Sequence, residues 1–204
     1  MIAIVDYGLG NIRAFANVYK ELDIPFLIAS KADDLKKASK IILPGVGAFD
    51  QAMELLQNSG MRELLDDLVL QRKLPVLGIC VGMQMLAHSS EEGKLPGLGW
   101  IDGVVKKFNA SRLVYKTRLP HMGWNKISPK KENKLFQELG DGPRFYFLHS
   151  YYFQCHYDGD TAAQTDYGDL FSSAVNSGNI YGVQFHPEKS HRNGIQLLKN
   201  FGNL

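Results

Sequence analysis

The chain has 204 residues, of which 45% are hydrophobic and 22% are charged, and its formal net charge is +2. This composition is typical of an ordinary globular protein, and the length suits one substantial core better than two, so we expect a single domain over 1–204. The small net charge gives no reason to expect a nucleic-acid partner, and no apolar stretch approaches the length of a membrane span.

The N-terminal segment predicts a strand, a glycine loop and a helix in succession. Ile2 to Asp6 is an apolar strand, and Tyr7-Gly8-Leu9-Gly10-Asn11 follows it. Ile12 to Leu22 then carries its apolar residues on one helical face. Two loop glycines suggest nucleotide binding, but the third glycine of the dinucleotide fingerprint is missing, so we favour a plain loop.

Predicted strands and helices alternate through the rest of the first half. Further strands are predicted at 24–29, 40–43 and 76–79, and further helices at 32–39, 49–57 and 61–71. This alternation predicts a three-layer α/β fold, in which a mostly parallel sheet has helices on both faces. Ligands of such sheets bind at the carboxyl ends of the strands. Three segments should meet there: 7–11, Pro44-Gly45-Val46-Gly47 and Cys80.

The second half of the chain is richer in predicted strands. A glycine- and proline-rich loop at 89–99 precedes them, and a closing helix is predicted at 192–201. The predicted strands are 101–108, 145–148, 152–157, 161–165, 172–175 and 180–184. No repeat and no convincing linker interrupts the chain, in agreement with a single domain.

Cys80 lies at a predicted corner between a strand and a helix. It is the centre of Gly78-Ile79-Cys80-Val81-Gly82, in which the flanking glycines permit a sharp turn that exposes the central side chain. The N-terminus of the following helix would stabilise a thiolate and leave the Val81 N–H free as an oxyanion donor. The pattern alone also fits a buried structural cysteine.

A catalytic thiol needs a general base, and His186 is the strongest candidate among six histidines. His186 ends a predicted strand, and Glu188 follows two residues later, on the same side of an extended segment. Glu188 could therefore orient the imidazole. A metal pair is the alternative, but no further ligands cluster in the sequence. His149 and His121 are more consistent with hydrogen-bonded core or rim residues.

The cysteines and the N-terminus bear on the cellular setting. Cys80 and Cys155 are the two cysteines of the chain, and the first apolar run ends at Asp6, too early for the core of a signal peptide. We therefore expect a reducing, cytoplasmic setting in which both remain thiols, although their spacing is compatible with a disulfide. Cys155 lies in an apolar predicted strand without glycine corners, which favours an inert, buried thiol.

Two motifs together resemble the class I, or triad, glutamine amidotransferases, a family with a flavodoxin-like α/β fold. They are Gly78-Ile79-Cys80-Val81-Gly82-Met83-Gln84 and His186-Pro187-Glu188. Within that class, further segments resemble the family of glutaminase subunits of imidazole glycerol phosphate synthases, from Met1 to Phe201. These segments are 6–11, 44–49, 121–125, 149–152 and 186–190.

The resemblance implies the roles of the site residues. Cys80 would attack the side-chain amide of L-glutamine and form a glutamyl thioester. His186, oriented by Glu188, would protonate the leaving ammonia and then activate water. The substrate contacts that the resemblance implies are Gly47, Gln84, Ser150 and Tyr151. No cofactor and no metal is expected.

The resemblance also implies how the oxyanion would be held. The Val81 N–H would act with a second donor from the loop at Gly45 and Val46. Glycine makes a flip of a peptide in this loop easy, since it tolerates backbone angles that other residues avoid. The resemblance implies that a peptide of this loop does not point its N–H at the oxyanion until the partner binds its substrate. We therefore expect the isolated chain to be a poor glutaminase.

A separate partner would receive the ammonia. The resemblance implies a cyclase subunit with a (βα)8 barrel, which makes imidazole glycerol phosphate and AICAR in histidine biosynthesis. Because ammonia must not escape, the partner should cover the mouth of the active site. Four residues are assigned to this interface or to the ammonia gate: Asn11, Lys189, Trp124 and Tyr146.

Three alternatives remain open at the level of sequence. A paralogous glutaminase subunit could supply ammonia to a sugar amidotransferase in surface polysaccharide biosynthesis, a branch that the aromatic run 145–153 weakly resembles. A catalytically silent interaction subunit should carry a damaged triad. A cysteine hydrolase that acts alone should need no partner and transfer no ammonia.

Overall fold

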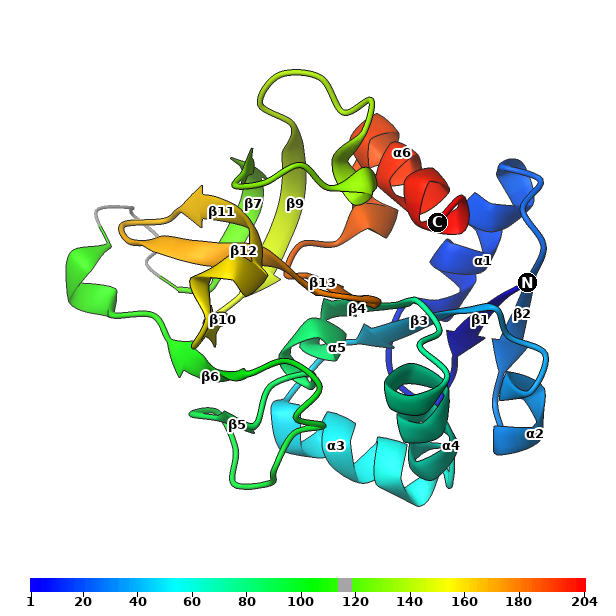
Figure 1. Ribbon diagram of the computed structural model, residues 1–204. Helices are drawn as coiled ribbons and strands as arrows, with labels where there is room; N and C mark the ends of the chain where they lie inside the picture. The colour runs from blue at the N-terminus through cyan, green and yellow to red at the C-terminus, as the bar shows by residue number, and fades with distance from the viewer. Residues whose placement is uncertain (114–118) are drawn as a thin grey trace.

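Buried apolar strands form the centre of the fold, as a sheet with helices on both faces requires. The computed structural model describes residues 1–113 and 119–204 (Figure 1). Strands β1 (Ile2–Val5), β3 (Lys40–Gly45) and β4 (Val76–Cys80) are almost entirely buried, whereas β2 (Phe26–Ala29) at the sheet edge is half-buried. With β13 (Ile180–Val183) they form a parallel array in the order β2-β1-β3-β4-β13.

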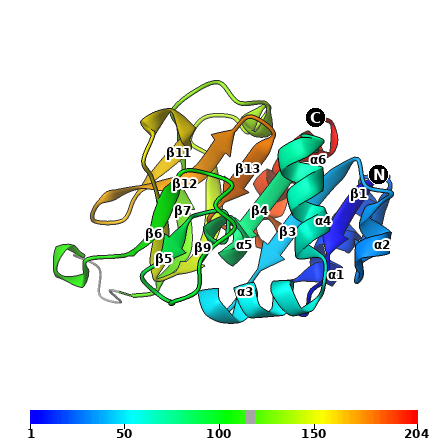
Figure 2. The same ribbon diagram turned by 60° about the horizontal axis from the view of Figure 1, so that its bottom comes forward.

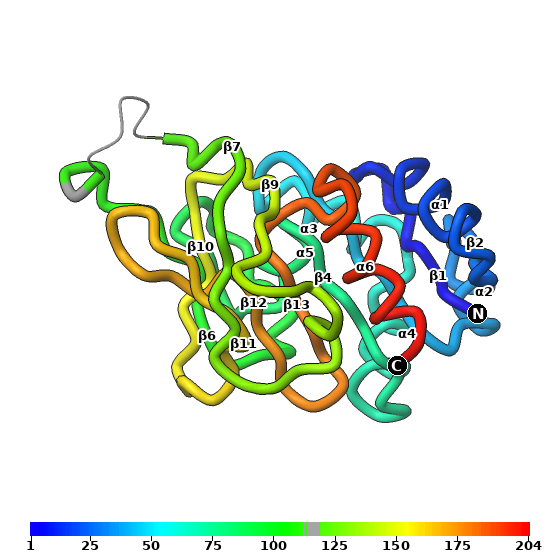
Figure 3. The backbone as a smooth tube through the Cα atoms, turned by 90° about the horizontal axis from the view of Figure 1, so that it is seen from above, coloured from blue at the N-terminus to red at the C-terminus, as the bar shows by residue number. Residues whose placement is uncertain are grey.

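Amphipathic helices cover this array on both faces. Helices α1 (Ile12–Glu21) and α6 (His191–Gly202) lie on one face, and α3 (Phe49–Asn58) and α4 (Arg62–Asp66) lie on the other (Figures 1 and 3). The short α2 (Ala32–Leu35) lies beside β2, and a π-helical turn, η1 (Asp67–Gln71), continues α4. The predicted three-layer α/β fold is confirmed.

The main sheet continues into an antiparallel half. Beyond β13 it contains β12 (Leu170–Ser177), β10 (Tyr151–Cys155), β6 (Gly103–Lys107) and the two-residue β5 (Ser89–Ser90). Strands β11 (Thr161–Asp166) and β8 (Ser128–Pro129) extend it at the side of β12. A separate antiparallel pair, β7 (His121–Lys126) and β9 (Arg144–His149), lies on the same side of the sheet as α6 (Figure 3).

Short helical turns complete the chain. They are α5 (Val81–Gln84) and the 3₁₀ turns η2 (Ala110–Arg112), η3 (Lys134–Phe136), η4 (Asp158–Asp160) and η5 (Pro187–Lys189). Within the described residues, no helix is both long enough and apolar enough to span a membrane.

Most predicted elements are present, with differences that matter near Cys80. Strand β3 continues through Pro44 to Gly45, where the prediction ended it at Leu43. The predicted helix 61–71 is divided into α4 and η1, and the predicted 32–39 is a single turn. Strand β7 was not predicted, because Gly123 and Asn125 are poor strand formers whose conformation depends on pairing with β9.

The parallel strands direct their carboxyl ends to one edge. Figure 2 shows β1, β3 and β4 side by side with their arrowheads at the same edge. Tyr7, just beyond β1, donates a hydrogen bond from its hydroxyl to the Pro44 carbonyl (2.7 Å), which ties the first two loops together. Cys80 ends β4 at this edge. The predicted convergence of the three loops is therefore observed.

Candidate active site

A strained backbone corner presents Cys80. Its φ of 56° and ψ of −112° lie where non-glycine residues are rarely found, and α5 begins at the next residue. Such strain persists only where the surroundings enforce it. Here the backbone on either side of Cys80 is closely packed. A Cβ on Gly78 would lie 2.6 Å from the Gly82 carbonyl oxygen, and one on Gly82 would overlap the Leu43 carbonyl. The arrangement is the predicted nucleophile elbow.

The end of β3 packs directly against this elbow. Gly45 pairs in register with Cys80, and a Cβ on Gly45 would overlap the backbone nitrogen of Gly82. Gly47 adopts a positive φ of 84°, which an L side chain rarely adopts. Glycine at both positions lets the loop 44–47 approach the backbone that follows the nucleophile.

His186 and Glu188 form a buried pair beside Cys80. Nδ1 of His186 lies 2.9 Å from Oε1 of Glu188, and the two side chains are 4% and 1% exposed. The same Oε1 accepts a hydrogen bond from Nδ2 of Asn11 (2.8 Å). Asn11 therefore helps to hold the carboxylate that orients the imidazole.

The backbone around His186 is fixed from two sides. Its N–H donates to the Tyr146 carbonyl (2.9 Å), and its carbonyl accepts from the Ser190 hydroxyl (2.6 Å). That hydroxyl also accepts from the Tyr146 N–H (3.0 Å). Strand β9 thus positions the imidazole even though it lies some forty residues earlier in the chain.

The electrostatic environment of His186 favours the imidazolium. Burial opposes the charge, but hydrogen bonds to Cys80 and Glu188 outweigh burial and raise the pKa of His186 to about 10. A histidine that stays protonated beside a cysteine is what a thiolate–imidazolium pair requires.

A cavity of about 350 Å³ opens in front of the cysteine. Ten of the residues singled out by sequence border it: Asn11, Val46, Gly47, Cys80, Val81, Gln84, Ser150, Tyr151, His186 and Lys189. Glu188 lies behind His186, and Gly45 lies behind the elbow. The structure thus brings together the predicted nucleophile, base and substrate-contact positions.

Trp124 and Tyr146 lie beside the cavity and do not line it. Trp124 is 40% exposed, stacks on His191 at a centroid distance of 5.2 Å and meets the Tyr146 ring edge to face. The Lys189 ammonium lies 6.0 Å from the centre of the Tyr146 ring. Together with the exposed Met122, these residues form a surface at the rim that contains both apolar and charged groups.

Two residues of the site were not predicted. Glu92 borders the cavity and is held by the Phe49 N–H, which donates to its Oε2 (3.0 Å); burial raises the pKa of this carboxyl. It lies in a loop whose sequence pattern gave no signal. Gln184 is fully buried, and its amide lies 3.7 Å from the Cys80 sulfur. Its spacing of two from His186 on an extended segment could have revealed it.

Two further histidines are engaged with partners other than Cys80, although His149 also borders the cavity. His149 donates from Nδ1 to the Tyr151 carbonyl (2.7 Å), so its Nε2 accepts from Nδ1 of His121 (3.0 Å). Nε2 of His121 in turn accepts from Nδ2 of Asn125 (3.2 Å). Both imidazoles are neutral members of a hydrogen-bond chain, as the sequence suggested.

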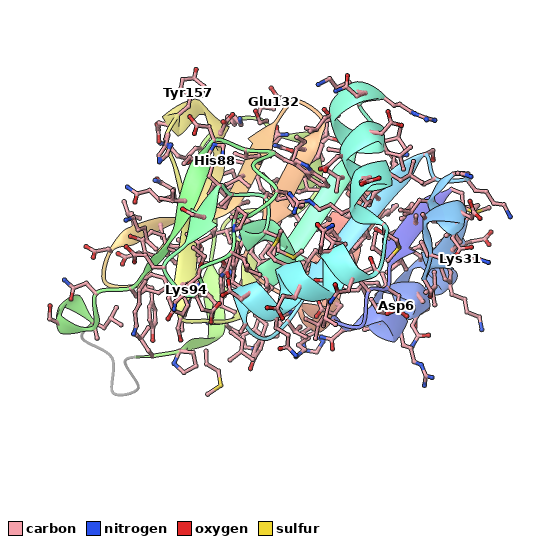
Figure 4. The ribbon with its side chains drawn as sticks, turned by 90° about the horizontal axis from the view of Figure 1, so that it is seen from below. Asp6, Lys31, His88, Lys94, Glu132 and Tyr157 are labelled. Atoms are coloured by element: carbon pink, nitrogen blue, oxygen red, sulfur yellow. The ribbon has the colours of Figure 1, made fainter. Side chains whose placement is uncertain are left out.

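Burial lowers the pKa of His121 to about 4, and burial together with His121 lowers that of His149 to about 3. His88 is exposed and lies, with Glu132 and Tyr157, in the upper part of the view in Figure 4, away from Asp6. Within residues 1–113 and 119–204, no group of three or more histidine, cysteine or acidic side chains is arranged to hold a metal ion.

The fold and this geometry agree with the comparisons to known proteins. A family model described as glutamine amidotransferase class-I matches residues 3–203. The chain belongs to the class-I glutamine amidotransferase family, so the predicted class of fold and of enzyme is confirmed.

Curated relatives match the chain over its whole length. The protein named "Imidazole glycerol phosphate synthase subunit HisH" of Leptospira interrogans is 54% identical over 204 residues, and the match covers 100% of both chains. The protein of the same name from Bdellovibrio bacteriovorus is 58% identical over 204 residues, again with 100% of both covered. A solved glutamine amidotransferase structure has a TM-score of 0.76 at 18% identity, covers 100% of this chain and 99% of that chain, and shows the shared fold.

Proposed function

We propose that this chain is the glutaminase subunit of an imidazole glycerol phosphate synthase, and that it hydrolyses L-glutamine to glutamate and ammonia. The observation that carries the proposal is the buried group of Cys80, His186 and Glu188 at the carboxyl ends of the strands. Relatives that carry the subunit name at 54% and 58% identity over their full length support it.

The chemistry follows from the protonation states of the pair. The Cys80 thiolate attacks the side-chain amide carbon of glutamine, and a tetrahedral intermediate forms. His186 gives its proton to the leaving nitrogen, so ammonia departs and a thioester remains. The neutral imidazole then takes a proton from water, whose oxygen attacks the thioester and releases glutamate. Glu188 fixes the tautomer and stabilises the imidazolium in both steps.

The oxyanion of each tetrahedral intermediate needs preorganised donors. The Val81 N–H is suited because it belongs to the first turn of α5, where backbone N–H groups have no intrahelical partner. The second donor would come from the peptides of Gly45 and Val46, since Gly45 pairs with Cys80 in register.

The cavity has the polar groups that an amino acid requires. Glu92 is a carboxylate that borders the cavity, and it can receive the α-ammonium group of glutamine. Gly47, Gln84, Ser150 and Tyr151 can supply backbone and side-chain hydrogen bonds to the rest of the substrate. This set makes a free amino acid a better fit than a peptide or a nucleotide.

The partner would be a cyclase subunit with a (βα)8 barrel, docked over Asn11, Trp124, Tyr146 and Lys189. An exposed tryptophan and a lysine over an aromatic ring, close to the cavity, are typical of an interface that excludes water. In that arrangement ammonia passes to the partner without reaching solvent. The intact triad disfavours a catalytically silent subunit.

The test combines the chain with a cyclase barrel and the aminated ribonucleotide substrate. Cys80→Ala should abolish product formation from glutamine and leave formation from added ammonia unchanged, whereas the matched Cys155→Ala should retain both activities. Loss of both activities in Cys80→Ala would contradict the channelling proposal. Glutamine hydrolysis should also rise when the barrel and its substrate are added, and an isolated chain as fast as the complex would contradict activation by the partner.

A further inference from the structure

A buried amide group lies next to the nucleophile and does not line the cavity. Gln184 is 0% exposed and follows β13, two residues before His186. Its Nε2 lies 3.7 Å from Sγ of Cys80, within the longer reach of hydrogen bonds to sulfur. Strand β12 fixes its backbone, because the Gln184 N–H donates to the Ser173 carbonyl (2.9 Å).

The neighbours of this amide determine which of its ends faces the sulfur. Nε2 of Gln84 lies 3.1 Å from the Tyr151 carbonyl, which can only accept, so Gln84 must present its NH₂ group there. The same Nε2 donates its second N–H to Oε1 of Gln184, at an N···O distance of 3.1 Å. With its oxygen engaged by Gln84, Gln184 must turn its own NH₂ group toward Cys80.

We propose that Gln184 is a catalytic residue, which donates an N–H to the Cys80 sulfur and stabilises the thiolate that attacks the substrate. The inference rests on the proposed glutaminase function and adds a donor to it. The charged sulfur accepts more strongly than a neutral thiol, so the bond is strongest before attack and after the thioester is hydrolysed. It weakens while sulfur is bonded to the acyl carbon. Gln84 is the positioning residue that orients this donor.

The alternative role is purely structural, with Gln184 as a satisfied core amide. The two roles differ in their pH dependence. Loss of a donor to the sulfur makes the thiolate less stable relative to the thiol, so activity falls most at low pH and recovers as the pH rises. Loss of packing lowers activity equally at every pH.

The test measures the rate at which iodoacetamide alkylates Cys80 as a function of pH, in a Cys155→Ala background so that Cys80 is the remaining thiol. Gln184→Met keeps the length of the side chain and removes the donor, and its profile should move about one unit to higher pH. Gln184→Glu keeps an acceptor for Gln84 and adds a negative charge, so its alkylation profile should move further to higher pH. Gln196→Met on α6 makes the same chemical change away from Cys80, and its alkylation profile should match that of the unsubstituted background.

Glutamine hydrolysis by the complex with a cyclase barrel is the second readout. Gln184→Met should lower kcat about tenfold or more at the acidic end of the profile and much less at the alkaline end. Unchanged alkylation profiles in folded Gln184→Met and Gln184→Glu would overturn the inference. If the profiles move but the unsubstituted complex does not hydrolyse glutamine, the thiolate donor stands and the proposed function fails.

Discussion

Two regions of this molecule bury histidines about equally and give them opposite properties. At the strand ends, His186 is 3% exposed, and its partners raise its pKa to about 10. Between β7 and β9, His121 and His149 are 3% and 6% exposed, and their pKa values fall to about 4 and about 3. His186 contacts a carboxylate and a thiol, whereas the other pair contacts a carbonyl, an amide and each other.

The difference shows that burial alone does not make a general base. Burial disfavours the imidazolium in both regions, and only a neighbouring anion reverses that effect. In the triad region the anion is built in, so the imidazole can hold a proton for the leaving group. In the His121 region every partner is neutral, so both rings act as rigid hydrogen-bond links with aromatic neighbours such as Phe147 and Tyr167.

The largest expected effect comes from removing the anion beside His186, which is the feature that distinguishes the two regions. Glu188→Gln keeps the size of the side chain but leaves His186 without a carboxylate, so the protonated form loses a stabilising partner and the tautomer is no longer fixed. We expect kcat for glutamine hydrolysis to fall about 10²- to 10⁴-fold, by analogy with loss of the acidic member of a serine-protease triad. Steady-state kinetics of the complex measure this.

Glu132→Gln is the matched control, since Glu132 is exposed and lies in the upper part of the view in Figure 4, away from Asp6. It should leave kcat unchanged. A Glu188→Gln enzyme with nearly normal kcat would show that the carboxylate is not needed to orient His186.

The second prediction concerns how the free energy of unfolding depends on pH. The two regions contribute to it with opposite sign and over different pH ranges. His121 and His149 titrate near 6.5 when unfolded and near 4 and 3 when folded, so the unfolded state binds more protons as the pH falls below about 6.5. Each should remove about 1.4 kcal/mol of unfolding free energy per pH unit in that window. For His186 the sign is reversed: its contribution is fully present below about 6.5 and is lost as the pH rises to about 10.

Urea unfolding at a series of pH values measures these slopes. His149→Gln should reduce the slope on the acidic side, whatever it does to stability at neutral pH. An acidic slope that is the same in His149→Gln and the unsubstituted chain would contradict the assignment of a neutral buried imidazole.

The smallest expected effect comes from placing an anion beside the neutral pair His121 and His149. Asn125→Asp places a carboxylate where an amide now lies 3.2 Å from Nε2 of His121. The pKa of His121 should rise by about 1 to 3 units, the range expected for a titratable group beside an opposite charge. NMR titration of the imidazole resonances measures this shift.

Asn125 also donates to the Asp166 carbonyl (3.0 Å), so the Asp variant should lose about 1 to 3 kcal/mol of stability as well. Asn125→Ala is the control that breaks the same bonds without adding charge. If the His121 pKa does not rise in Asn125→Asp relative to Asn125→Ala, the absence of an anion is not the cause of its low value.

The sequence was most informative where local rules decide the structure. Apolar runs such as 2–6 and 76–79 match β1 and β4 within a residue or two, because a strand buried on both faces must be apolar throughout. The glycines around Cys80 predicted the elbow, since a sharp turn with an exposed central side chain has few other solutions.

The sequence was least informative where contacts are distant. Strand β7 was missed because its pairing with β9 is set by residues 18 to 28 positions away. Glu92 was missed because a loop carries it back to the start of α3, where the Phe49 N–H fixes it. Asn11 was predicted at the rim, but its bond to Glu188 joins residues 177 positions apart.

The sequence by itself determined the α/β class and predicted a nucleophile, and a base with its orienting acid, because each depends on residue types at short spacing. The tertiary structure decided which imidazole is charged, which end of Gln184 faces the sulfur, and which carboxylate borders the cavity. Those properties depend on partners brought together from distant strands, and electrostatic and hydrogen-bond energies are set by distance in space rather than by distance along the chain.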